Sequence, residues 1–139
     1  MFEHTIKVHG FHLDLYQHVN NARYLEFLED ARWAMFEQCA LVPLMVERAL
    51  GAHIVHMDLS FKAPATLYDT LKITSYVSRI GNKSYVIRQE IVNQKTDTLV
   101  LEANITSCIV DNNTKKSIVI EGEVLEGIKF FQQDQVSTS

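Results

Sequence analysis

The sequence predicts an α+β fold made of one long helix and one curved antiparallel sheet. Apolar residues recur with helical spacing over a single long stretch, from Asn21 to Gln38. From Val55 onward the spacing changes to two, which is the period of a strand with one buried face. These strands follow one another through short turns, and that order favours antiparallel pairing.

Length and composition fit one domain and exclude several classes of function. A chain of 139 residues suits a single hydrophobic core. The net charge of −4 provides no basic field for nucleic acid. No apolar run reaches membrane-spanning length, and the first residues do not form a signal peptide. Cys39 and Cys108 lie far apart in sequence and predict reduced thiols in a cytoplasmic protein.

The first predicted element is a short strand from Thr5 to Gly10, in which Ile6 and Val8 share the buried face. A polar loop follows and leads into the long helix. Asn20 or Asn21 is the predicted N-cap of this helix, because an amide side chain can accept a hydrogen bond from the open N–H groups of the first turn.

The predicted helix has one strongly apolar face. The residues on that face repeat at helical intervals and are Tyr24, Phe27, Leu28, Ala31 and Met35. Leu25, Trp33 and Phe36 add apolar surface outside it. The helix should therefore be covered on more than one side, by a sheet that wraps it or by a second subunit. Pro43 should end or restart the helix, and residues 44–50 can form one or two further turns.

After the helix the sequence predicts four strands and one brief edge segment. They cover residues 55–62, 71–78, 84–93, 98–111 and 117–120. In the first of these strands the predicted buried residues are Val55, Met57, Leu59 and Phe61. Gly81-Asn82 forms a hairpin turn between the second and third strands. The single domain is predicted to span residues 1–131, and residues 132–139 to form a mobile polar tail.

The passage from loop to helix contains Asp14, then His18-Val19-Asn20-Asn21, then Tyr24-Leu25-Glu26. This set of residues resembles the signature of the 4-hydroxybenzoyl-CoA thioesterase family, and its bacterial long-chain acyl-CoA thioesterase branch most of all. The resemblance implies the hotdog fold, with a central helix wrapped by five to six strands. It also implies a homodimer or homotetramer with sheets joined edge to edge, and hydrolysis of long-chain fatty acyl-CoA without a metal or cofactor.

Asp14 and Asn21 are the first two catalytic candidates. By residue type alone, Asp14 fits a turn or a local cap. The resemblance implies that this aspartate either attacks the thioester carbonyl or activates water, and the sequence leaves both open. The resemblance also matches Asn21 to the position whose main-chain N–H polarises that carbonyl. Amide groups at a helix start lack partners and can stabilise an oxyanion.

Six further residues complete the candidate site. His18 is a catalytic candidate that could instead hold the loop by hydrogen bonds. The candidates for substrate binding are Tyr16, Asn20, Tyr24, Arg79 and Lys83. The two tyrosines equally suit packing with a polar tip. Arg79 and Lys83 are solvated strand-end charges by default, and the resemblance implies phosphate binding near such loops, partly from a neighbouring subunit.

The sequence also bears on three alternatives: a metal site, a dehydratase and a non-catalytic binding protein. Four histidines near Asp14, at positions 4, 9, 12 and 18, match no metal-site spacing, and no metal is predicted. A hotdog dehydratase acting on acyl-carrier-protein substrates needs a histidine and an acid across a subunit boundary. Glu29 could supply the acid, but no histidine occupies the matching motif. A non-catalytic acyl-CoA-binding hotdog protein is the third alternative, and the presence of Asp14 argues against it.

Overall fold

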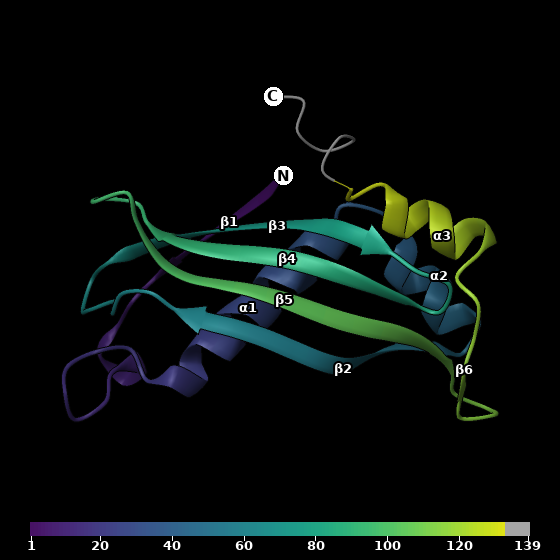
Figure 1. The fold of residues 1–139 in the computed structure, drawn as a ribbon, viewed down its shortest axis with the longest axis horizontal. Helices are drawn as coiled ribbons and strands as arrows, with labels where there is room; N and C mark the ends of the chain where they lie inside the picture. The colour runs from purple at the N-terminus through teal and green to yellow at the C-terminus, as the bar shows by residue number, and fades with distance from the viewer. Residues whose placement is uncertain (133–139) are drawn as a thin grey trace.

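One long helix lies across a six-stranded antiparallel sheet that curves around it (Figure 1). The structure, a computed structural model, describes residues 1–132. The helix is α1 (Asn21–Phe36). The main strands are β1 (Phe2–Lys7), β2 (Leu50–Phe61), β3 (Thr70–Ile80), β4 (Ser84–Asn93) and β5 (Thr98–Asp111), in the order β1-β3-β4-β5-β2. A two-residue strand, β6 (Lys116–Ser117), pairs with β5. The predicted α+β hotdog arrangement is confirmed.

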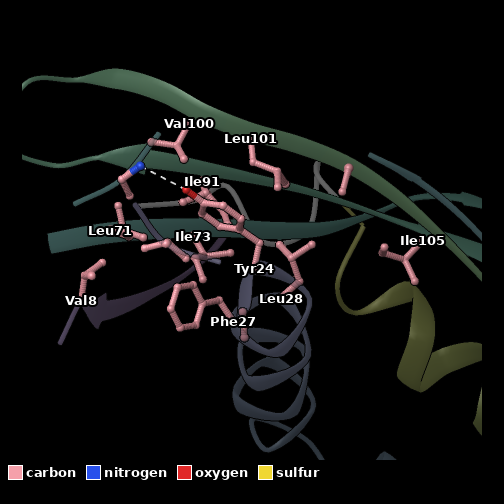
Figure 2. Close-up of a cluster of buried hydrophobic side chains, with 14 residues drawn as sticks. Val8, Tyr24, Phe27, Leu28, Leu71, Ile73, Ile91, Val100, Leu101 and Ile105 are labelled. Atoms are coloured by element: carbon pink, nitrogen blue, oxygen red, sulfur yellow. Dashed lines mark hydrogen bonds between the residues drawn. The ribbon is translucent and has the colours of Figure 1, made fainter. Parts of the chain in front are cut away.

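The core forms where the predicted face of α1 meets the concave side of the sheet. All five residues predicted on that face are buried. They meet aliphatic side chains from the middle strands, among them Leu71, Ile73, Ile91, Leu101 and Ile105 (Figure 2). Each such side chain contributes about 1.5–3 kcal/mol when fully buried. The helix packs against β1 and β3, so its other side faces the β2 edge with less cover.

The first strand begins earlier than predicted. It pairs Phe2 with Ser75 and Lys7 with Thr70, and it ends before Val8. The main chain of Val8 instead bonds to the loop before β3, donating to Asp69 and accepting from Tyr68. The predicted range of 5–10 is therefore wrong at both ends. Pairing with β3, rather than the local alternation, sets the limits of β1.

The prediction of a buried face on β2 is also wrong in part. Val55 is 59% exposed and Phe61 is 51% exposed, while Met57 and Leu59 are only partly buried against the core. β2 lies at the edge of the sheet, away from the side on which α1 packs. Its pairing with β5 also slips between Ile54 and His56, which breaks the simple alternation of faces.

Two short helices close one end of the molecule. α2 (Leu41–Glu47) carries Pro43 in its first turn, where a missing N–H is tolerated, and it begins earlier than predicted. α3 (Gly122–Lys129) was not predicted as a helix. A Cβ on Gly127 would lie 2.9 Å from the side chain of Leu41. Gly127 therefore permits the close packing of α3 on α2.

The end of the chain and the two cysteines were also predicted from the sequence. The predicted edge segment 117–120 pairs with β5 one residue earlier, as β6. Gln132 forms an isolated bridge with Val77, and the rest of the predicted tail lies outside the described residues. Both cysteines are free thiols. Across residues 1–132, every helix is too short or too polar to cross a bilayer.

Candidate active site

The loop that carries Asp14 is a small closed unit fixed to the start of α1. Leu13 and Val19 form an antiparallel bridge at its neck. Across the loop, the N–H of Asp14 donates to the carbonyl of His18 at 2.9 Å. The N–H of Val19 then donates to the carbonyl of Ala65, also at 2.9 Å, which ties the loop to the segment before β3. These main-chain bonds give Asp14 a defined position relative to the helix.

Within this loop the two oxygens of the Asp14 carboxylate have different surroundings. Oδ1 accepts hydrogen bonds from the N–H groups of Tyr16 at 2.9 Å and His18 at 3.4 Å. Within residues 1–132 no group donates a hydrogen bond to Oδ2, and the side chain is half-buried. One oxygen therefore holds the orientation of the carboxylate, and the other can attack a carbonyl or accept a proton.

The start of α1 leaves one main-chain donor open. Asn20 is the N-cap, and its Oδ1 accepts from the N–H of Ala22 at 2.9 Å. The carbonyl of Asn20 accepts from the N–H of Arg23 at 2.8 Å. In the described part of the chain the N–H of Asn21 has no acceptor. Asn21 is thus the first helical residue rather than the cap, and its open amide carries part of the positive charge of the helix start.

The other candidates around Asp14 divide into exposed and buried residues. His18 and Tyr16 are exposed on the loop, and Tyr16 keeps 75% of its surface. Tyr24 is only 3% exposed, and its hydroxyl accepts a hydrogen bond from the N–H of Ala65 at 3.1 Å (Figure 2). Burial raises the pKa of Tyr24. Tyr24 therefore supports the segment around Ala65 from inside the core.

Arg79 and Lys83 lie at the opposite end of the sheet from Asp14. They flank the β3–β4 hairpin beside α2, whereas the Asp14 loop adjoins the start of β3 (Figure 1). β3 has 11 residues. At about 3.3 Å per residue, its two ends are roughly 35 Å apart. A single chain therefore does not bring these two cations to Asp14.

Lys62 is a cation that does lie near the helix start. It follows β2 directly, and its N–H donates to the carbonyl of Val100 at 2.8 Å. The ring of the preceding Phe61 lies 5.8 Å from that of Tyr24. The Lys62 ammonium is exposed and lies 3.7 Å from Glu102. In the sequence, Lys62 and Arg79 both lie at the end of a strand. Only the order of the strands in the sheet shows that Lys62, and not Arg79, is near the start of α1.

His12 is a structural residue of the site that the sequence did not single out. Its ring is 8% exposed, and Nδ1 accepts a hydrogen bond from the N–H of His9 at 2.9 Å. The carbonyl of His12 accepts from the N–H of Asn20, the helix cap. Burial lowers the pKa of His12, and the charges of Arg23 and His9 act in the same direction. The neutral ring therefore holds the main chain of His9, and the carbonyl of His12 joins this segment to the helix cap.

We expect this ring to make stability depend on pH. The unfolded chain protonates His12 at an ordinary pKa of 6.5, while the folded chain resists protonation. The contribution of the neutral His12 ring to the free energy of unfolding is fully present above about pH 6.5. It is lost as the pH falls toward the lower pKa of the folded state. His12→Asn offers an acceptor that does not titrate. Denaturant unfolding measured from about pH 8 to about pH 5 should show that the free energy of unfolding falls less steeply for this variant than for the unmodified protein. Parallel curves for the two proteins would contradict the role of His12.

Comparisons with known proteins agree with the geometry. Residues 9–128 match the family model described as the thioesterase-like superfamily. The chain is 40% identical to the long-chain acyl-CoA thioesterase FadM of Escherichia coli K12 over 89% of its length and 94% of that protein. It is 34% identical to the acyl-CoA thioester hydrolase YbgC of Escherichia coli O6:H1, covering 80% of this chain and 83% of the other.

The fold is also similar to a solved structure. The crystal structure of YbaW, a probable thioesterase from Escherichia coli, superposes with a TM-score of 0.89 and 38% identity. The match covers 96% of this chain and 100% of the other. The likeness therefore extends over nearly the whole domain, including the loop and the start of α1.

Proposed function

Because the chain belongs to the thioesterase-like superfamily, we propose that it hydrolyses acyl-CoA to a free acid and coenzyme A. The observation that carries this proposal is the pairing of an open carboxylate oxygen on Asp14 with an open amide on Asn21. The similarity to FadM supports long-chain fatty acyl groups as the substrate class. The proposed setting is the cytoplasm and fatty acid metabolism.

In the proposed mechanism, Asp14 and the Asn21 amide act on opposite ends of the thioester C=O bond. The carbonyl oxygen accepts a hydrogen bond from the Asn21 N–H, which stabilises the negative charge that develops there. Asp14 either attacks the carbonyl carbon itself or removes a proton from an attacking water. The C–S bond then breaks, and the thiolate of coenzyme A leaves and takes up a proton. If Asp14 is the nucleophile, water then hydrolyses the mixed anhydride between the acyl group and Asp14, which releases the free acid and restores the carboxylate. No metal takes part in this scheme.

The other site residues have supporting roles in this proposal. The main-chain groups of Tyr16 and His18 orient Asp14, and their exposed side chains are available to the substrate. Asn20 positions the open amide through its cap. Arg79 and Lys83 could contact the phosphates of coenzyme A only from a neighbouring subunit, since they lie far from Asp14 in their own chain.

The proposed assembly is a homodimer, or a pair of dimers, joined through the β2 edges. The outer side of β2 offers unpaired main-chain groups to a second strand. Exposed apolar residues lie along this side of the molecule: Trp33 is 60% exposed, Ile54 is 46% exposed and Val55 is 59% exposed. A second copy would cover this surface, as the spread of apolar residues around α1 predicts.

Light scattering at micromolar concentration should give at least twice the monomer mass of 15.9 kDa. Val55→Glu, which puts a charge on the β2 edge, should reduce that mass toward the monomer. Val119→Glu is the matched control, because Val119 is 41% exposed and lies outside β2. A monomer mass for the unmodified protein across the concentration range would refute the dimer.

One assay separates the proposed activity from its alternatives. The purified protein is mixed with palmitoyl-CoA and a thiol reagent, and in parallel with an enoyl substrate under hydration conditions. Release of coenzyme A without hydration supports the thioesterase. Hydration alone would support a dehydratase, in which Glu29 is the candidate acid. Binding of palmitoyl-CoA without either reaction would support a non-catalytic acyl-CoA-binding protein.

A further inference from the structure

A cavity of about 300 Å³ opens on the side of α1 that faces β2. α2 closes one end of it, and the concave faces of β4 and β5 form its floor. Most of its wall is apolar and includes Trp33, Phe36, Leu41, Met45, Ile54 and Ile87. Its size is at the lower end of the range for ligand pockets. Such a wall suits the hydrocarbon part of an acyl chain.

One cation interrupts this apolar wall. Arg32 lines the cavity, and its guanidinium donates to Oε1 of Gln89 at 3.0 Å. Gln89 is itself fully buried, and its Nε2 donates to the carbonyl of Leu28 and to Oγ of Ser75, each at 3.0 Å. Gln89 is thereby held in place and fixes one side of the guanidinium.

The rest of the Arg32 guanidinium has no charged partner in the described chain. A guanidinium carries five N–H donors, and Gln89 is the acceptor that the structure provides for them. Within residues 1–132 no carboxylate lies within ion-pair distance of Arg32. Burial lowers the pKa of Arg32, but the residue is only half-buried, and no buried side-chain nitrogen in the described chain lacks a partner, so its remaining N–H groups reach solvent. The cavity therefore contains donors that a ligand oxygen could satisfy.

Two hydroxyl groups lie on the floor of the same cavity. Tyr85 and Ser107 are directly opposed across the β4–β5 ladder, and they are 3% and 5% exposed. Burial raises the pKa of Tyr85, and the neighbouring Ser107 acts in the opposite direction. Together with Arg32 they make one part of an otherwise apolar cavity polar.

This polar part lies in line with the proposed thioester site. Arg32 follows Asn21 by eleven positions. Eleven residues make about three helical turns, so the two residues share a face and lie ~16 Å apart along the axis. Leu25, 38% exposed, lies between them on that face. An extended chain advances about 3.5 Å for every three single bonds, so ~16 Å corresponds to roughly fourteen bonds.

We infer that Arg32 selects acyl chains that carry an acceptor oxygen, a hydroxyl or a carboxylate, near the end remote from the thioester. This inference rests on the proposed thioesterase function and names a substrate class for the same site. The hydrocarbon part lies along α1, and the remote oxygen accepts hydrogen bonds from Arg32. Hydrogen bonds from a charged donor are the stronger kind, and a guanidinium binds carboxylate through two of them.

The charge of Glu29 affects whether a remote hydroxyl or a remote carboxylate binds better. It is exposed at the cavity wall one turn before Arg32, and its charge acts on Arg32 without an ion pair. A remote carboxylate gains from Arg32 and is repelled by Glu29, whereas a remote hydroxyl avoids the repulsion. The experiment therefore compares hydroxylated and carboxylated acyl-CoA with the unsubstituted acyl-CoA.

The first arm uses the unmodified protein. Values of kcat/KM are measured for plain, ω-hydroxy and ω-carboxy acyl-CoA of about ten to about eighteen carbons. The ratio of an oxygenated substrate to the plain one should pass through a maximum near roughly fourteen to sixteen carbons. A ratio that is flat or falls steadily with length would overturn the inference. Hydrolysis of the plain substrates in the same arm verifies the proposed function independently.

The second arm removes the cation. Arg32→Met keeps an unbranched apolar stem and removes the guanidinium. Arg48→Met is the matched control, since Arg48 pairs with Glu123 outside the cavity. Arg32→Met should lower the oxygenated-to-plain ratio by about tenfold or more, and Arg48→Met should not change it. Arg32→Lys, a second variant that keeps the charge, should retain part of the ratio. If Arg32→Met slows all substrates equally, or only reduces the oligomeric mass, Arg32 supports Gln89 or the dimer and the inference is wrong.

Discussion

Replacing Asp14 by asparagine is expected to lower kcat for palmitoyl-CoA by about 10²–10⁴-fold, the usual effect of losing a general base. The variant keeps an oxygen that can accept from the N–H groups of Tyr16 and His18, so the loop should keep its conformation. It replaces the open oxygen with an amide nitrogen, which can neither attack a carbonyl nor accept a proton from water. The measurement is the steady-state release of coenzyme A.

Asp97→Asn is the matched control for this substitution. Asp97 is exposed in the turn between β4 and β5, and its φ of 59° is a conformation that asparagine tolerates. Its turnover should equal that of the unmodified protein. If Asp14→Asn keeps more than half of the unmodified turnover while remaining folded, Asp14 is not the catalytic carboxylate.

Replacing Asn21 by proline is expected to lower turnover by about 10²–10³-fold, the effect of losing one oxyanion donor. Proline removes the N–H that has no acceptor in the described chain. The first position of a helix accepts proline without loss of an internal hydrogen bond. Asn20 already has φ −62° and ψ 138°, the extended conformation that a residue before proline prefers. Circular dichroism and the oligomeric mass should therefore be unchanged.

Asn21→Ala separates the amide from the side chain. The helix cap is Asn20, so this variant leaves the capping hydrogen bond to Ala22 in place. It keeps the main-chain donor and should turn over palmitoyl-CoA far faster than the proline variant. Equal rates for the two folded variants would mean that the Asn21 amide does not bind the oxyanion.

The parts of the fold that were predictable are those with strong local periodicity. The face of α1 from Tyr24 to Met35 follows the helical repeat over several turns, and burial in the structure follows it residue by residue. Burial alternates along β4 and along most of β3 and β5, because the sheet has one face under α1. The alternation is interrupted after Val77 in β3 and at Val100–Leu101 in β5, where the pairing register shifts. Where one element packs against a single partner, the periodicity of the sequence is sufficient to predict which of its residues are buried.

The errors come from positions that depend on more distant structure. β2 alternates in sequence as regularly as β3, yet its place at the sheet edge leaves Val55 in solvent. α3 is short and contains two glycines, one of which is needed only because α3 packs against Leu41 of α2. The local spacing of apolar residues predicts neither the order of the strands nor the packing of one helix on another.

The candidate site divides in the same way. Asp14 and Asn21 were found through a local signature, and a local loop and helix start hold them together. The sequence left the N-cap open between Asn20 and Asn21, and the capping hydrogen bond assigns it to Asn20. Arg79 and Lys83 required knowledge of which sheet end carries the loop. His12 gave no signal, because its role comes from burial and from contacts to His9 and Asn20.

The most direct test of the proposed mechanism is a crystal structure with a stable analogue of palmitoyl-CoA, in which a methylene group replaces the thioester sulfur. The mechanism predicts the carbonyl oxygen at about 2.7–3.1 Å from the main-chain nitrogen of Asn21. It also predicts that the free oxygen of Asp14, or a water bound to it, faces the carbonyl carbon. An ordered ligand whose carbonyl lies away from the start of α1 would contradict the mechanism.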